Sequence, residues 1–93
     1  MDHSSSRKLA AILFADIAGY TAAMQENEQK AMAMLNHYQQ VLKDTMQKHM
    51  GEVIKNYGDG SICILPTASG AVKSAMAIQK ALKEDPAVPL RIG

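Results

Sequence analysis

Apolar and polar residues alternate between two kinds of stretch along this chain: short unbroken apolar runs, and longer segments with apolar residues every three or four positions. The longest unbroken run, Leu9–Ala15, is typical of a buried central strand, which we expect over 9–14. Residues 27–49 have the helical period, with Asn27 as N-cap and Gly51 as the left-handed residue after the helix. The predicted buried stripe of this helix comprises Ala31, Met34, Leu35, Tyr38, Val41, Leu42 and Met46.

The second half of the chain carries a hairpin signal followed by another helical period. Two β-prone runs, Val53–Tyr57 and Ser61–Leu65, flank Gly58-Asp59-Gly60, in which glycine supplies the positive φ of a tight turn. A second helix is predicted from a Thr67 cap to a stop at Pro86, and a last strand over Val88–Ile92. Its predicted apolar face comprises Ala68, Ala71, Val72, Ala75, Met76, Gln79 and Leu82. Most methionines of both helices are expected in the core.

This order of elements predicts an α+β domain with a ferredoxin-like βαββαβ core. Right-handed crossovers would give one antiparallel sheet with both helices on one face. The third strand then lies beside the first and runs against it. Asp16, which closes the first strand, is therefore expected close to Asp59 at the hairpin tip.

Length and charge narrow the classes of function. The 93 residues suit one domain, and a net charge of +1 excludes a nucleic-acid binder driven by charge. No apolar run is long enough to cross a bilayer, and residues 1–6 are expected to be a disordered lead without a signal peptide. Cys63 is the single cysteine, so no internal disulfide is expected. These features together predict a cytoplasmic protein.

Asp16 and Asp59 are the candidate metal ligands. Two carboxylates 4–5 Å apart repel by roughly 3–4 kcal/mol at an effective dielectric of 20, and a divalent cation removes that cost. Ligands that are all oxygen suit Mg²⁺ or Mn²⁺. Each residue also has an ordinary structural interpretation, Asp59 as a turn residue and Asp16 as a helix cap.

Two further features carry possible chemistry. The segment Ile17-Ala18-Gly19-Tyr20-Thr21 passes from a strand end through glycine into a helix start, where exposed N–H groups can hold phosphate oxygens. An ordinary strand-to-helix turn is the alternative. Lys55, which alternation places on one face with Val53 and Tyr57, is either a donor to a ligand or a surface lysine.

Two blocks of the sequence make the chain recognisable. The first block is Leu9-Ala10-Ala11-Ile12-Leu13-Phe14-Ala15-Asp16-Ile17-Ala18-Gly19-Tyr20-Thr21. The second block is Val53-Ile54-Lys55-Asn56-Tyr57-Gly58-Asp59-Gly60. In sequence and in spacing, the two blocks closely resemble class III nucleotidyl cyclase catalytic domains. The resemblance runs from about Arg7 to Gly93. It identifies residues 7–93 as the N-terminal half of such a domain.

The resemblance implies roles position by position. Asp16 and Asp59 match the aspartates that hold two Mg²⁺ or Mn²⁺ ions, and Ile17 matches the residue whose carbonyl is a third ligand. The segment from Ile17 through Ala18, Gly19 and Tyr20 to Thr21 matches the turn around the triphosphate. Lys55 matches the purine-reading position, where lysine is typical of adenylate cyclases and suits the unprotonated ring nitrogen of adenine.

The resemblance also implies a homodimer, because the family's site pairs the metal ligands of one domain with the base reader of its mate. The reaction would be two-metal phosphoryl transfer, in which the ribose 3′-hydroxyl of ATP attacks the α-phosphorus and pyrophosphate leaves. The family's second purine reader and its transition-state asparagine and arginine follow Arg91-Ile92-Gly93 and are not in this sequence. We therefore expect the 93 residues alone to be inactive.

Two other interpretations stay open at this stage. One is a truncated, non-catalytic module that binds nucleotide or metal and regulates through dimerisation. The other is a diguanylate-cyclase-like or polymerase-palm-like domain, which the hairpin Tyr57-Gly58-Asp59-Gly60 disfavours because it lacks the glycine–glycine–acidic signature of those cyclases.

Overall fold

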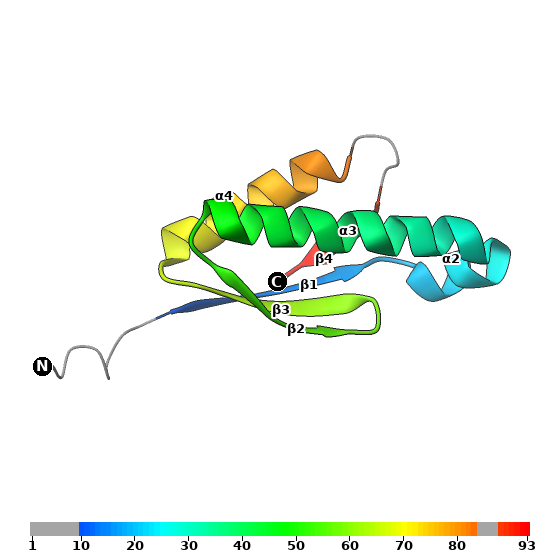
Figure 1. The fold of residues 1–93 in the computed structure, drawn as a ribbon, viewed down its shortest axis with the longest axis horizontal. Helices are drawn as coiled ribbons and strands as arrows, with labels where there is room; N and C mark the ends of the chain where they lie inside the picture. The colour runs from blue at the N-terminus through cyan, green and yellow to red at the C-terminus, as the bar shows by residue number, and fades with distance from the viewer. Residues whose placement is uncertain (1–9, 84–87) are drawn as a thin grey trace, which may run out of the picture.

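A computed structural model of the chain describes residues 10–83 and 88–93. Its elements are, in order, β1 (Ala11–Ile17), α2 (Tyr20–Glu26), α3 (Glu28–Lys48), β2 (Glu52–Tyr57), β3 (Gly60–Leu65), α4 (Ala68–Ala81) and β4 (Leu90–Ile92). The strands form one antiparallel sheet in the order β2-β3-β1-β4, and α3 and α4 lie together on one face (Figure 1). The predicted ferredoxin-like α+β fold is confirmed.

The connection from β1 to β2 contains two helices where one was predicted. Asn27 has an extended backbone (φ −157°), which ends α2, and its side chain accepts a hydrogen bond from the Lys30 N–H at 3.1 Å, which caps α3. The predicted Asn27 cap is therefore confirmed. The Thr67 cap of α4 is confirmed as well, because its hydroxyl accepts from the Gly70 N–H at 2.9 Å.

The core lies between the sheet and the two long helices. Its fully buried side chains include Tyr38, Leu42 and Met46 of α3, which pack with Ile17 and Cys63 of the sheet. The expectation that most methionines are in the core is wrong, since Met32, Met50 and Met76 are more than half exposed.

The predicted buried face of α4 is also partly wrong. Val72 and Met76 point outward, whereas Ser74 and Ile78 are fully buried. Three-residue spacing fits more than one stripe of an alanine-rich helix, so the sequence pattern did not select the right one.

The end of α3 departs from prediction at Gly51. The left-handed residue is Met50 (φ 63°), which is 84% exposed. Gly51 is needed for space instead, because a Cβ there would lie 2.9 Å from the Ile64 carbonyl oxygen and from side-chain atoms of Leu65 and Met46. The close approach of the chain to β3, and not backbone conformation, explains this glycine.

Some predictions fall outside the described residues, namely the lead at 1–6, the start of the first strand at Leu9 and the helix stop at Pro86. Within residues 10–83 and 88–93, no helix combines the length and the apolar character that a membrane span needs.

Candidate active site

The two candidate metal ligands lie at the same end of the sheet. In the β1–β3 ladder Asp16 pairs with Gly60, the residue after Asp59, and the Ile17 N–H donates to the Asp59 carbonyl oxygen at 3.1 Å. The turn that carries Asp59 contains Gly58 in the left-handed conformation (φ 58°). The predicted adjacency of Asp16 and Asp59 is therefore confirmed at the level of the backbone.

Asp16 lies on the face of the sheet that the helices leave uncovered, which we call the open face. Its neighbours Ala15 and Ile17 are buried against the helices, so alternation directs the Asp16 side chain the other way. Asp16 does not cap α2, because the N-cap of that helix is Gly19 and it makes no side-chain capping bond. The structural interpretation of Asp16 as a helix cap is therefore wrong.

Arg91 contacts one of the candidate metal ligands, which the sequence prediction missed. It pairs with Asp16 in the β1–β4 ladder, and its Nε donates to Asp16 Oδ1 at 2.9 Å. The Arg91 side chain is 70% exposed and that of Asp16 is 38% exposed. A signal existed in the alternation of Leu90, Arg91 and Ile92, which places one charged residue on the open face of a strand that is otherwise apolar.

The candidate triphosphate turn connects β1 to α2. Gly19 is left-handed (φ 71°), and a Cβ built there would have nothing within 4 Å. The left-handed backbone thus favours glycine at this turn, and the space beside it is open. The following residues Tyr20 and Thr21 begin α2, where the first N–H groups of any helix have no partner within it.

In the other two residues of this turn, Ile17 and Ala18, the groups that could contact a ligand belong mainly to the backbone. The Ile17 side chain is fully buried, so only its carbonyl can meet a ligand. The Ala18 N–H is already used, since it donates to the Pro89 carbonyl oxygen at 2.9 Å.

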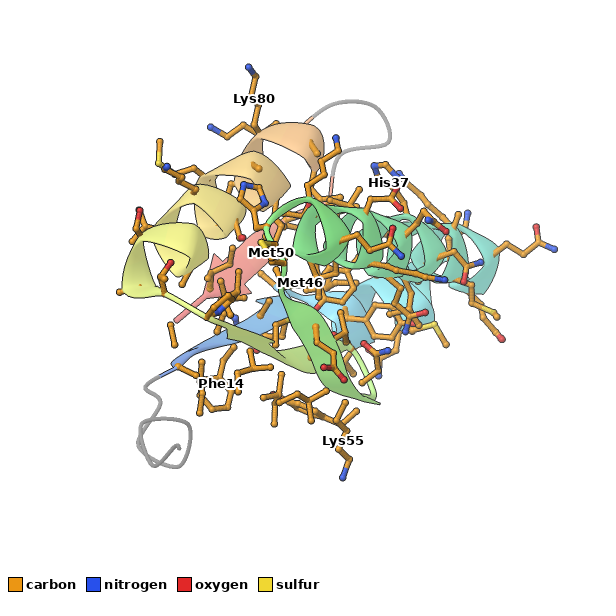
Figure 2. The ribbon with its side chains drawn as sticks, turned by 60° about the vertical axis from the view of Figure 1, so that its left-hand side comes forward. Phe14, His37, Met46, Met50, Lys55 and Lys80 are labelled. Carbon is orange, nitrogen blue, oxygen red and sulfur yellow. The ribbon has the colours of Figure 1, made fainter. Side chains whose placement is uncertain are left out.

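Lys55 lies apart from the two aspartates. It pairs with Ile62 on β3, and Ile62 pairs with Phe14 on β1, so Lys55 is two strands away from β1. At 4.7–4.9 Å a strand, this is about 10 Å across the sheet. Figure 2 shows Lys55 and Phe14 directed away from the helices, on the open face.

The expected face of Val53 is wrong, because β2 contains a bulge. Val53 pairs with the buried Cys63, whereas Lys55 pairs with Ile62, and Ile54 is the extra residue between them. Val53 therefore faces the helices and Lys55 faces the opposite way. Lys55 and Tyr57 do share a face, as alternation predicted.

Several apolar side chains are exposed on β1 and β2. Ile12 and Phe14 of β1 are 56% and 49% exposed, and Ile54 and Tyr57 of β2 are 53% and 45% exposed. The other face of the same strands packs against the helices and contributes to the core, so among the described residues no element covers the open face.

Comparison with known proteins agrees with this fold. The sequence model of the family described as "Adenylate and Guanylate cyclase catalytic domain" matches residues 3–84. The protein named "Putative adenylate cyclase 3" of Rhizobium meliloti (strain 1021) is 38% identical over 98 residues, which cover 97% of this chain and 17% of that protein.

Solved structures of similar fold include a bacterial light-regulated adenylyl cyclase, with a TM-score of 0.80 and 20% identity, and the guanylyl cyclase Cya2, with a TM-score of 0.71 and 23% identity. Each match covers 90% of this chain and 50% of the solved chain. At such identities these two likenesses establish the fold alone. The family match and the curated relative go further, and this chain belongs to the family of adenylate and guanylate cyclase catalytic domains.

Proposed function

We propose that the chain supplies the metal- and triphosphate-binding half of a class III adenylate cyclase domain, which converts ATP to cyclic AMP and pyrophosphate. The observation that carries the proposal is the meeting of Asp16 and Asp59 at one end of the sheet, beside the turn from Ile17 to Thr21. The chain spans half of each solved cyclase chain compared above, so catalysis is proposed for the complete domain.

The donor set fits Mg²⁺ or Mn²⁺. Asp16, Asp59 and the Ile17 carbonyl offer oxygen atoms only, and the described residues contain no group of three His, Cys, Asp or Glu side chains that could hold a metal ion. Such an incomplete set suits ions that complete their coordination with substrate phosphates and water. Two bound ions would neutralise phosphate charge and favour the alkoxide form of the ribose 3′-hydroxyl.

The chain's own groups then hold the substrate. The N–H groups of Gly19, Tyr20 and Thr21 face phosphate oxygens, and the Thr21 hydroxyl adds a donor. Arg91 balances the charge of Asp16 in the metal-free chain. With Asp16 serving as a metal ligand, the exposed guanidinium of Arg91 would be available to phosphate oxygens, which it could bind in bidentate fashion.

Lys55 reads the base in a second subunit. Its separation from Asp16 across the sheet supports a site shared between two copies, in which one gives the aspartates and the other gives Lys55. The exposed apolar residues Ile12, Phe14 and Tyr57 on the same face support a homodimer that buries them. We also infer a cytoplasmic location, because ATP, the proposed substrate, is present there.

The first prediction concerns metal binding. Asp59→Ala should weaken Mn²⁺ binding by roughly tenfold or more, since it removes one of two charged ligands. The fold should remain, because Asp59 is a turn residue outside the core. Calorimetric titration of the chain with Mn²⁺ measures the affinity, and urea unfolding checks the fold. Asp44→Ala is the matched control, since Asp44 is an exposed carboxylate on α3 bonded to Gln40. Equal Mn²⁺ affinity in wild type and Asp59→Ala would make Asp59 a turn residue only.

The second prediction concerns competition at Asp16. Arg91→Ala should raise the Mn²⁺ affinity of the nucleotide-free chain by about 1.4- to fivefold, because it removes a competing cation whose exposed ion pair contributes about 0.2–1 kcal/mol. Arg91→Lys keeps the charge and should stay near wild type. A lower affinity in Arg91→Ala would show that the arginine supports the metal site instead.

The third prediction concerns base selection in a protein that includes the complete catalytic domain. Lys55→Glu should lower the ATP:GTP ratio of kcat/KM by roughly 5- to 150-fold, the equivalent of 1–3 kcal/mol for one mismatched buried hydrogen bond. Lys73→Glu makes the same charge change on the exposed side of α4 and should leave the ratio unchanged. An unaltered ratio in Lys55→Glu would remove the main support for ATP as substrate.

The fourth prediction concerns subunit sharing in the same complete-domain protein. Asp59→Ala should be nearly inactive alone and Lys55→Glu should be impaired with ATP, yet a mixture should be more active than either, because a mixed dimer contains one site with both native residues. Cyclic AMP formation before and after mixing measures the effect. A mixture no more active than its parts would place both residues in a site within one subunit. Mn²⁺ binding without cyclase activity in the unmutated protein would favour the non-catalytic regulatory module.

A further inference from the structure

A chain of hydrogen bonds, buried at Tyr38 and partly buried where it reaches Asn56, lies behind the candidate active site. Tyr38 on α3 is fully buried, and its single hydroxyl proton is shared between two acceptors, the Ala15 carbonyl oxygen at 2.9 Å and Ser61 Oγ at 3.0 Å. Ser61 is also fully buried, and its hydroxyl donates to Asn56 Oδ1 at 2.6 Å. The helix is thereby bonded to β1 and β3 directly, and to β2 through Ser61.

These contacts follow one row of the sheet. Ser61 on β3 pairs with Ala15 on β1 and with Asn56 on β2. The next row along the sheet contains Asp16 paired with Gly60. The row bonded to Tyr38 is therefore one residue away from the row that positions the metal ligands, on the opposite face.

Each member of the row is close in sequence to a candidate functional residue. The Ala15 carbonyl belongs to the peptide unit that contains the Asp16 N–H, and Ser61 is two residues after Asp59. Asn56 directly follows Lys55. A contact that fixes this row thus restricts the backbone on which Asp16, Asp59 and Lys55 are mounted.

The hydroxyl groups of Tyr38 and Ser61 are buried in a core that is mostly apolar. The buried polar side chains of the described residues are Thr45, Ser61 and Ser74, and the buried core is otherwise apolar except for the Tyr38 hydroxyl. Burying hydroxyls costs free energy unless each is bonded, whereas apolar residues would fill the same space without that cost. Satisfied networks of this kind favour one geometry over alternatives. Burial also raises the pKa of Tyr38 to about 12, so its hydroxyl remains a donor near neutral pH.

We propose that Tyr38, with Ser61 and Asn56, positions the metal site: the network fixes the peptide before Asp16 and the strand after Asp59, and so sets the affinity for the divalent cation. This inference rests on the proposed function, since it assigns a supporting shell to the same carboxylates. Tyr38 contacts neither metal nor substrate and acts through the backbone. Supporting contacts of metal ligands commonly change metal affinity 10- to 100-fold.

The test compares Tyr38→Phe, Ser61→Ala and the double variant in the 93-residue chain, by calorimetric titration with Mn²⁺ and by urea unfolding. Each single variant should bind Mn²⁺ roughly tenfold more weakly, at the low end for supporting contacts because the effect passes through the backbone. The double variant should lose little more than the weaker-binding single variant, because both changes interrupt one network.

Ser74→Ala is the matched control. Ser74 is a fully buried serine on α4 whose Oγ has no hydrogen-bond partner in the described part of the chain. Removing its hydroxyl should leave Mn²⁺ affinity unchanged, which separates the network from a general effect of deleting a buried hydroxyl. Ser61→Ala carries the test if Tyr38→Phe does not fold.

A second readout uses the complete-domain protein. Tyr38→Phe should need about tenfold more Mn²⁺ for half-maximal activity, while kcat at saturating Mn²⁺ stays within about twofold, because the ligands themselves are intact. Wild-type Mn²⁺ affinity in Tyr38→Phe and Ser61→Ala would overturn the proposal, and so would full additivity in the double variant. Loss of Mn²⁺ binding in those variants and in Ser74→Ala alike would also overturn it. If wild type and Asp59→Ala bind Mn²⁺ equally, the proposed function itself fails.

Discussion

The antiparallel pairing of β1 with β3 is the constraint on which the rest of the site depends. It sets Asp16 opposite Gly60 and allows the Ile17 N–H to bond the Asp59 carbonyl oxygen. Two carboxylates that are 43 positions apart in sequence (59 minus 16) thereby share one end of the sheet. A register slip of one residue would turn Asp16 toward the helices and leave a charge in the core. The alternation of buried and exposed residues in β1 therefore fixes the register on which both the fold and the position of Asp16 depend.

Among the described residues, the charge at this end of the sheet comes from Asp16, Asp59 and Arg91. Asp16 and Asp59 bring two negative charges, and Arg91 supplies one positive charge through its bond to Asp16. Because that ion pair is well exposed, it contributes little to stability and is readily exchanged. Such a pair is compatible with the proposed metal site, since a strong buried pair would oppose binding of a cation.

Local sequence signals predicted the fold and the aspartate pair, whereas the long-range side-chain contacts of Arg91 and Tyr38 were not predicted. The caps at Asn27 and Thr67 and the hairpin at Asp59 depend on neighbours in sequence, and the structure has them where predicted. The Arg91–Asp16 bond joins residues 75 positions apart and requires the register of β4. Tyr38 fits an apolar stripe, and only the fold shows that its hydroxyl meets Ala15.

The bulge in β2 decides which face of the sheet Lys55 and Asn56 occupy. Val53 faces the helices opposite Cys63, so regular alternation would have paired Ile54 with Ile62 and turned Lys55 toward the helices opposite Ser61. The extra residue moves Lys55 to the open face, where Asp16 also lies, and brings Asn56 opposite Ser61. One inserted residue thus exposes the candidate base reader and gives the buried hydroxyl network its last acceptor. Position 54 itself has an exposed apolar side chain, and local sequence gives no sign of a bulge there.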